Sequence, residues 1–261
     1  MTEDSWKIGN LTLKSRVLLG TASYPNMDVM LQSLEASTAQ LVTMSLRRVN
    51  VATEGSENLY KILRERGYHL LPNTAGCFTA KEAILTAEMA REALDTNLIK
   101  LEVIADEDTL LPDSHELLEA ASILVREGFT VLPYTNDDPV LALKLEEVGC
   151  AAVMPLAAPI GSGLGIRNPH NIELIKTRAS VPVIIDAGLG TASDIAEAFE
   201  LGSDAVLLNT AVARAGDPVR MARAVGAAAF AGREAYLAGR MPKKFFAESA
   251  SPLKGRAWQS V

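Results

Sequence analysis

Cysteine and histidine are scarce in this sequence. Only Cys77 and Cys150 carry thiols among its 261 residues, and His69, His115 and His170 lie far apart along the chain. Two cysteines cannot build a disulfide framework, and the scattered histidines lack the spacing of metal ligands. We therefore expect free thiols in a reducing compartment, no metal site and no bound cofactor.

Basic residues are outnumbered, and apolar stretches are interrupted. There are 32 acidic and 25 basic residues, so the net charge is −7, which argues against a nucleic-acid-binding protein. The first residues, Met1 to Trp6, lack the basic start and apolar core of a signal peptide. Residues 148–166 carry no charge, but Pro155, Pro159 and four glycines prevent a continuous apolar helix there. These features predict a cytoplasmic protein that does not span a membrane.

Short apolar runs and helix-like segments alternate along the rest of the chain. The apolar runs are rich in Val, Leu and Ile, without strict alternation, as in strands that are buried on both faces. They are Arg16–Gly20, Ala39–Leu46, His69–Thr74, Asn97–Ile104, Thr130–Tyr134, Cys150–Pro155, Val181–Asp186 and Asp204–Asn209. Helical patterns lie at 26–37, 56–66, 80–93, 113–126, 137–149, 169–178, 193–202 and from Asp217-Pro218 onward.

This alternation predicts a single parallel (β/α)8 barrel over residues 1–261. Eight strand–helix units in a chain of about 250 residues fit a closed barrel. An open doubly wound sheet is the alternative, but it usually carries a dinucleotide fingerprint after its first strand, where this chain has 21–24, Thr-Ala-Ser-Tyr. Residues 1–14 are expected to form an N-terminal hairpin with Gly9-Asn10 as its turn, and residues 240–261 a C-terminal tail.

Lys100 and Glu102 stand out within the fourth apolar run. Strand alternation places them on one face, with Ile99, Leu101 and Val103 on the other. The apolar face should pack against helices, so Lys100 and Glu102 should point into the barrel. Burial of the amine favours its neutral, nucleophilic form. A buried Lys–Glu pair that only fills the barrel is the alternative interpretation.

Two glycine-containing loops suggest a phosphate site. Asp186 ends the seventh run and is followed by Ala187-Gly188, and Asn209-Thr210 ends the eighth. Barrels often bind phosphate after these two strands, through backbone N–H groups. Asp186 ends its strand at the point where a proton-transfer group is needed. Residues 159–165 hold three alternating glycines, beginning at Gly161, which suit either an anion-binding loop or simple turns.

Cys77 and the pair Arg47-Arg48 are weaker candidates. Cys77 follows the third strand and either faces the site or is a small buried thiol. Arg47-Arg48 ends the second apolar run, where one guanidinium either meets an anionic substrate or lies on the surface.

Several motifs, in order over nearly the whole chain, resemble bacterial thiazole synthase. The similarity runs from about Ile8 to about Leu253. Its motifs are Leu70–Gly76, Ile99–Ile104, Leu110–Asp113, Val131–Thr135, Ala158–Gly163, Asp186–Gly188, Leu208–Ala211 and Ser251-Pro252. The chain departs from the family pattern at Ala22-Ser23, where the family has Gly-Lys, and at Ala157, where it has glycine.

The resemblance implies an enzyme that makes thiazole phosphate carboxylate from 1-deoxy-D-xylulose 5-phosphate, a glycine-derived imine and sulfur. The sulfur comes from the thiocarboxylate of a sulfur-carrier protein, a separate enzyme supplies the imine, and the protein is a dimer or tetramer. By motif, Lys100 forms a Schiff base with the sugar, and Glu102 and Asp186 move protons. The phosphate-binding residues implied are Gly161, Ala187, Gly188, Asn209 and Thr210.

Two other functions remain open at this point. An aldolase-like Schiff-base enzyme would share the inward lysine and the phosphate loops, and a non-catalytic sugar-phosphate-binding barrel would leave Lys100 structural. The C-terminal tail has five basic residues, one acidic residue and three aromatic residues. We expect it either to dock an acidic partner or to pack on a barrel.

Overall fold

The protein is described here from a computed structural model, which covers residues 4–45 and 56–250. The chain begins with an antiparallel hairpin of β1 (Trp6–Ile8) and β2 (Leu11–Leu13). Gly9 in its turn has a φ of +53°, a conformation that glycine adopts without strain. The predicted hairpin and its turn are confirmed.

Eight parallel strands form the barrel, in the order β8-β7-β6-β5-β4-β3-β10-β9. Single bridges from Val153 to Val183 and from Leu156 to Asp186 join the two ends of this order and close the ring. The strands are β3 (Val17–Gly20), β4 (Leu41–Ser45), β5 (His69–Asn73), β6 (Leu98–Leu101), β7 (Thr130–Thr135), β8 (Met154–Pro155), β9 (Ile184–Asp186) and β10 (Ala205–Leu208). The predicted barrel is confirmed, and the open-sheet alternative is wrong.

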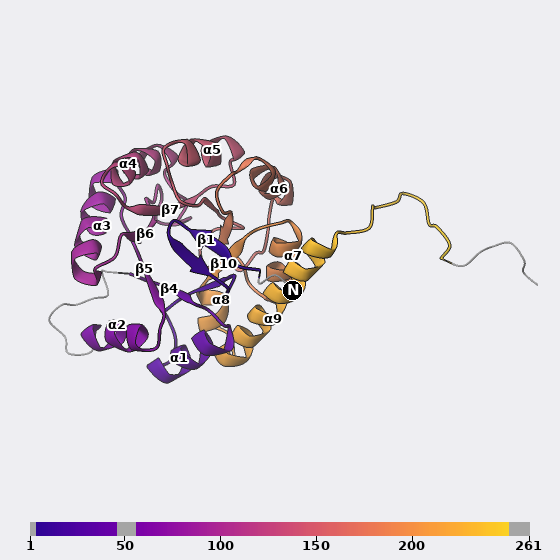
Figure 1. Cartoon of the computed structure of the whole chain (residues 1–261), viewed down its shortest axis with the longest axis horizontal. Helices are drawn as coiled ribbons and strands as arrows, with labels where there is room; N and C mark the ends of the chain where they lie inside the picture. The colour runs from indigo at the N-terminus through magenta and orange to yellow at the C-terminus, as the bar shows by residue number, and fades with distance from the viewer. Residues whose placement is uncertain (1–3, 46–55, 251–261) are drawn as a thin grey trace, which may run out of the picture.

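Helices surround the strands in a ring (Figure 1). They are α1 (Met27–Ala36), α2 (Ser56–Glu65), α3 (Ala80–Leu94), α4 (Ser114–Arg126), α5 (Pro139–Glu147), α6 (Pro169–Arg178), α7 (Ala192–Glu200), α8 (Thr210–Ala213) and α9 (Pro218–Ala238). Their starts follow capping chemistry: Thr79 accepts from the backbone N–H of Glu82, and Asp217 accepts from that of Arg220. The helix expected from Ser193 begins one residue earlier, because Thr191 and Asp194 form a capping box. No helix in the described ranges is long and apolar enough to cross a membrane.

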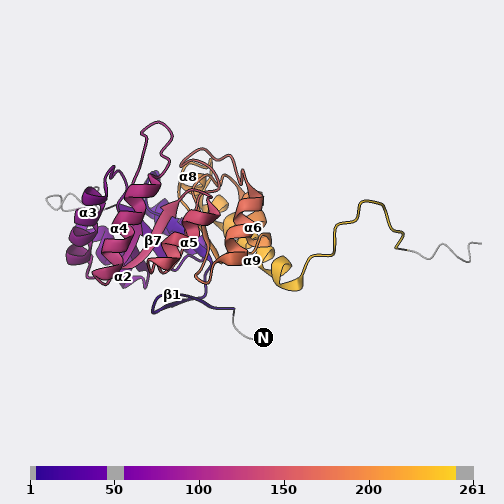
Figure 2. The same cartoon turned by 90° about the horizontal axis from the view of Figure 1, so that it is seen from above.

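The core has an outer layer between strands and helices and an apolar plug inside one end of the barrel. On β6, Ile99 and Leu101 belong to the outer layer, as the alternation predicts. The plug includes Leu71, Leu132 and Ile184, and the hairpin residue Trp6 packs against it. Figure 2 shows the hairpin at this end, with α8 at the other. The hairpin end of the barrel interior is therefore filled by apolar side chains.

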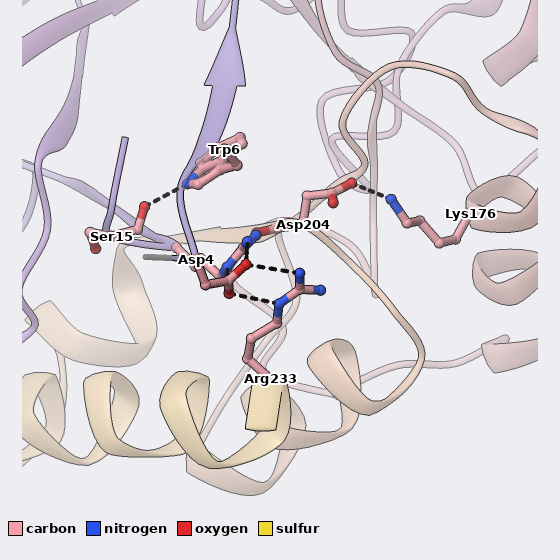
Figure 3. Close-up of polar contacts among 7 residues, drawn as sticks. Asp4, Trp6, Ser15, Lys176, Asp204 and Arg233 are labelled. Carbon is pink, nitrogen blue, oxygen red and sulfur yellow. Dashed lines mark hydrogen bonds and ion pairs between the residues drawn. The ribbon is translucent and has the colours of Figure 1, made fainter. Parts of the chain in front are cut away.

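A charged network holds the hairpin segment to the barrel. The Asp4 carboxylate accepts two hydrogen bonds from Arg16 (3.0 and 2.7 Å) and two from Arg233 of α9 (2.9 and 3.1 Å). Arg16 also donates to the backbone carbonyl of Asp204 (2.6 Å), and the Asp204 carboxylate pairs with Lys176. Figure 3 shows Arg233 reaching from α9 to Asp4, with Trp6 bonded to Ser15 nearby. Asp4 thus joins the start of the chain to its last helix.

The chain leaves the barrel after α9. Residues 239–250 are exposed and extend away from the helices (Figure 1). The barrel and the hairpin therefore account for all regular structure in the described ranges, and the role expected for the tail stays a prediction.

Candidate active site

A cavity of about 530 Å³ lies at the carboxyl ends of the strands, on the side opposite the hairpin. It is lined by the eight residues to which the sequence analysis gave a catalytic or phosphate-binding role: Lys100, Glu102, Gly161, Asp186, Ala187, Gly188, Asn209 and Thr210. They come from four loops or strand ends that are far apart in the sequence. Ligand sites of parallel barrels occupy this end, so the cavity is the candidate active site.

Lys100 is buried at the floor of the cavity between two carboxylates. Its Nζ atom lies 2.6 Å from Asp186 Oδ2 and 3.2 Å from Glu102 Oε1. All three side chains are 3–7% exposed. The Lys100 ammonium also lies 5.8 Å from the centre of the Tyr134 ring, which is completely buried. The inward orientation of Lys100 and Glu102 is as predicted.

The two carboxylates oppose the effect of burial on the pKa of Lys100. Burial by itself lowers the pKa of this amine, but the charges of Asp186 and Glu102 outweigh burial and raise the pKa to about 12. Burial also raises the pKa of Glu102, and Asp186 adds to this effect, while Lys100 opposes it. Burial favours the neutral amine, as expected, but the two neighbouring carboxylates favour the protonated form, and one of them is placed to take the proton before the amine acts as a nucleophile.

The loop after β9 is shaped by close packing against the loop after β8. Ala187 has a φ of +64°, which is unusual for a residue with a Cβ atom. Gly188 has a φ of +73°, and a Cβ atom there would lie 2.5 Å from atoms of Ala158. The N–H of Gly165 donates to the carbonyl of Gly188 (2.9 Å). Glycine at position 188 is thus required for the close contact between the loops, and Gly188 also lines the cavity.

The residues expected to bind phosphate differ in their surroundings. At Gly161, a Cβ atom would have no described atom within 4 Å, so the backbone there borders open space. Asn209 lies against Gly20, where a Cβ atom would come within 2.8 Å of the asparagine side chain. The Asn209 Oδ1 atom is buried and has no hydrogen-bond partner in the described part of the chain. Asn209 thus combines a place in the cavity lining with an acceptor that lacks a partner in the described residues, and the Gly161 backbone borders open space.

Several polar residues of the cavity had no assigned role in the sequence analysis, and three of them lie at strand ends. Thr43 and Ser45 of β4 and Asn73 of β5 line it, and Asn73 donates to the Thr43 hydroxyl (3.3 Å). Their position at the carboxyl ends of strands is the signal that could have identified them.

The remaining candidates do not join this group. Cys77 is completely buried in the outer core and does not line the cavity, so it is a small buried thiol. Arg47-Arg48 lies outside the described residues. Within 4–45 and 56–250, no cluster of three or more metal-ligating side chains occurs.

Comparison with known proteins gives one consistent family. The model of the family described as "Thiazole biosynthesis protein ThiG" matches residues 7–252. The chain is 56% identical over 256 residues to "Thiazole synthase" of Sorangium cellulosum, with 98% of each chain covered. It is also 56% identical over 252 residues to "Thiazole synthase" of Geobacter sulfurreducens, with 97% of each covered.

Solved structures agree with this result. The crystal structure of the Amycolatopsis orientalis BexX/CysO complex matches with a TM-score of 0.83 and 34% identity, covering 91% of this chain and 97% of that one. A 3-hexulose-6-phosphate synthase, 14% identical with a TM-score of 0.55, shares the fold alone. The resemblance drawn from the motifs is confirmed: this chain belongs to the ThiG family of thiazole biosynthesis proteins, which are enzymes of thiamine biosynthesis.

Proposed function

We propose that this thiazole synthase forms a Schiff base between Lys100 and 1-deoxy-D-xylulose 5-phosphate. It would then combine the sugar with a glycine-derived imine, dehydroglycine, and with sulfur to give thiazole phosphate carboxylate. The observation that carries the proposal is the Lys100 amine, 2.6 Å from Asp186 and 3.2 Å from Glu102, at the floor of the cavity. A purely structural ion pair would not need to face a cavity of this size.

The chemistry begins with a proton transfer. One carboxylate takes a proton from the Lys100 ammonium, and the free amine attacks the ketone carbon of the sugar. Loss of water from the carbinolamine then gives an imine, which draws electrons from the neighbouring carbons. Glu102 and Asp186 are placed to remove a proton from one of these carbons and return one to another, which tautomerises the sugar. Glu102 suits the role of proton acceptor because its pKa is raised.

The sugar phosphate is proposed to bind at the ends of β9 and β10. Backbone groups of Gly161, Ala187 and Gly188, together with Asn209 and Thr210, border the cavity there. The unpartnered Oδ1 of Asn209 would accept a hydrogen bond from a sugar hydroxyl. Binding the phosphate at one end and the ketone at Lys100 would fix the sugar across the cavity floor.

The sulfur is proposed to arrive as a thiocarboxylate on a carrier protein, and the imine from a separate enzyme. The BexX/CysO structure supports a protein partner, because BexX, which is 34% identical to this chain, is complexed with a second protein. We also propose that the enzyme is a cytoplasmic homo-oligomer, a dimer or a tetramer. The negative net charge supports the expectation that nucleic acid is not a partner.

Reductive trapping tests the Schiff base. Wild-type enzyme is incubated with 1-deoxy-D-xylulose 5-phosphate and borohydride, and peptide masses are measured. The expected result is a sugar adduct on the peptide that contains Lys100, and no adduct in Lys100→Ala. Binding of the sugar without an adduct would instead support a non-catalytic sugar-phosphate-binding barrel.

Reconstitution tests the sulfur source. Thiazole phosphate should form only when the carrier thiocarboxylate and dehydroglycine are both supplied. Carbon–carbon bond cleavage or formation without a sulfur donor would point to an aldolase-like enzyme instead.

A further inference from the structure

The strand next to Lys100 and Glu102 ends just before it could pair with Glu102. β5 pairs with β6 through Asn73 and Lys100, and β5 then ends. The chain turns away at once: the N–H of Cys77 donates to the carbonyl of Thr74 (3.2 Å), and Gly76 has a φ of +79°. Glu102 is 5% exposed, so its backbone N–H and carbonyl need partners inside the protein.

The Thr74 side chain supplies these partners. Its hydroxyl accepts a hydrogen bond from the Glu102 N–H (2.7 Å) and donates one to the Glu102 carbonyl (2.7 Å). The backbone N–H of Thr74 also donates to the carbonyl of Lys100 (3.2 Å). One fully buried residue therefore holds the backbone of both Lys100 and Glu102 at the point where strand pairing stops.

We propose that Thr74 is a positioning residue that keeps the Glu102 carboxylate beside Lys100 for the proton transfers. This inference rests on the proposed function, because it concerns the acid–base step of that reaction. Thr74 does not touch the ligand cavity, so its effect must pass through the Glu102 backbone. Without the hydroxyl, two buried backbone groups lose their partners, and the segment has to shift to recover them.

Three variants separate positioning from packing. Thr74→Val removes the hydroxyl and keeps the shape of the side chain, whereas Thr74→Ser keeps the hydroxyl. Thr135→Val is the matched control, because Thr135 also ends a strand, is completely buried, and has a hydroxyl without a hydrogen-bond partner in the described residues. All three variants are first compared with the wild type by circular dichroism and thermal unfolding.

The first measurement needs no substrate. Acetic anhydride labelling at several pH values, read by peptide mass, reports how readily Lys100 loses its proton. If Thr74→Val lets Glu102 move away, one of the two charges that hold the proton on Lys100 is lost. We expect Lys100 labelling to be at least about threefold faster in Thr74→Val at the same pH. Thr74→Ser and Thr135→Val should match the wild type.

The second measurement follows the reaction. With 1-deoxy-D-xylulose 5-phosphate, Thr74→Val should still give the reduced Lys100 adduct. Its rate of solvent hydrogen exchange into the bound sugar should fall about 10- to 100-fold, because Glu102 is misplaced. Thr74→Ser should recover most of this rate.

Two results would overturn the positioning role. One is unchanged labelling and exchange in Thr74→Val, and the other is an equal change in Thr74→Val and Thr135→Val, which would mean general loosening of the core. Absence of an adduct in the wild type would instead refute the proposed function, and the labelling comparison would still decide whether Thr74 positions Glu102.

Discussion

Asp186 Oδ2 lies 2.6 Å from Lys100 Nζ, closer than Glu102 Oε1 at 3.2 Å. One buried cation thus faces two buried carboxylates that come from separate parts of the barrel. Such a site cannot easily hold both carboxylates ionised without the lysine charge. The raised pKa of Glu102 makes this residue the natural recipient of a proton when Lys100 gives one up.

Asp186→Asn is expected to make Lys100 easier to deprotonate. Asp186 has the largest effect among the charges that raise the pKa of Lys100, so its removal should lower that pKa. Borohydride trapping with the sugar should then reach its maximum at a lower pH than in the wild type. Turnover should nevertheless fall about 10²- to 10⁴-fold, because a proton-transfer group is lost.

Glu102→Gln is the matched comparison for this variant. It should shift the trapping profile in the same direction but by less, because Glu102 lies farther from the amine and has a smaller effect on its pKa. A trapping profile that stays in place in both variants would contradict the electrostatic account of Lys100.

The Lys100→Ala variant is expected to fold, but its stability should depend on pH. Without Lys100, two buried carboxylates lose their counter-charge, at a cost of about 3–5 kcal/mol. The pKa of Glu102, already raised by burial, should rise further, because Lys100 no longer opposes the shift. A raised carboxyl pKa means that the folded state gains stability as the pH falls through it. Denaturation should therefore show higher stability near pH 5 than near pH 8.

The double variant Lys100→Ala/Glu102→Gln tests whether Glu102 causes this pH dependence of stability. Its stability should depend less on pH than that of Lys100→Ala, because the carboxyl group that titrates is gone. Lys61→Ala, at a lysine that is 74% exposed, should change little at any pH. Equal pH dependence in the single and double variants would show that another group titrates.

The fold and the orientation of Lys100 could be predicted because they depend on local patterns. Apolar runs at regular intervals predict a barrel, and a period of two places Lys100 and Glu102 on one face. The predicted fourth strand is too long at its C-terminal end. The apolar run extends to Ile104, but β6 ends at Leu101. Beyond Leu101 the backbone bonds to the Thr74 side chain, and Ile104 bridges to Pro112.

The charge state of Lys100 could not be predicted from sequence spacing. Burial is a local property, and by itself it lowers the pKa of Lys100, as the sequence predicts. The opposing effect comes mainly from Asp186, which is 86 positions away and approaches Lys100 only because the barrel closes. The glycine-rich loops pose the same difficulty, since the contact of Gly188 with Ala158 depends on two loops meeting in space.

Gly188→Ala is expected to destabilise the protein and to distort the site. The new Cβ would lie 2.5 Å from Ala158, and the residue would also occupy a φ of +73°. Overpacking and backbone strain together should cost roughly 2–4 kcal/mol. Urea denaturation measures the cost, and binding of the phosphosugar should weaken because the two loops are pushed apart.

Gly161→Ala separates the cost of backbone strain from the cost of overpacking. Gly161 has a similar φ of +76°, but nothing in the described part of the chain lies within 4 Å of the added Cβ. Its cost should be about 1 kcal/mol, from the backbone conformation alone. If both variants lose equal stability, the contact between the loops is not what requires glycine at position 188.

Asp4→Asn is expected to destabilise the protein at neutral pH, and the loss of stability should be smaller at acidic pH. Hydrogen bonds from Arg233 hold the pKa of Asp4 well below its usual range; partial burial opposes this, and Arg16 reinforces it. A lowered carboxyl pKa gives stability that is fully present above the unfolded-state pKa of about 4 and is lost as the pH falls further. Because Asp4 is 39% exposed, we expect a loss of only about 1 kcal/mol, or about 2–4 °C in Tm.

The pH dependence distinguishes charge from shape at Asp4. The Tm difference between wild type and Asp4→Asn should be constant from about pH 8 to pH 5. It should narrow below about pH 4, because the Asp4 carboxyl group of the unfolded wild-type chain then begins to take up a proton while that of the folded chain stays ionised. Asp108→Asn, at an exposed position in the segment between β6 and α4, should leave Tm unchanged throughout. A difference that persists undiminished at about pH 2.5 would mean that the amide fails to fit between Arg16 and Arg233, rather than that a charge is missing.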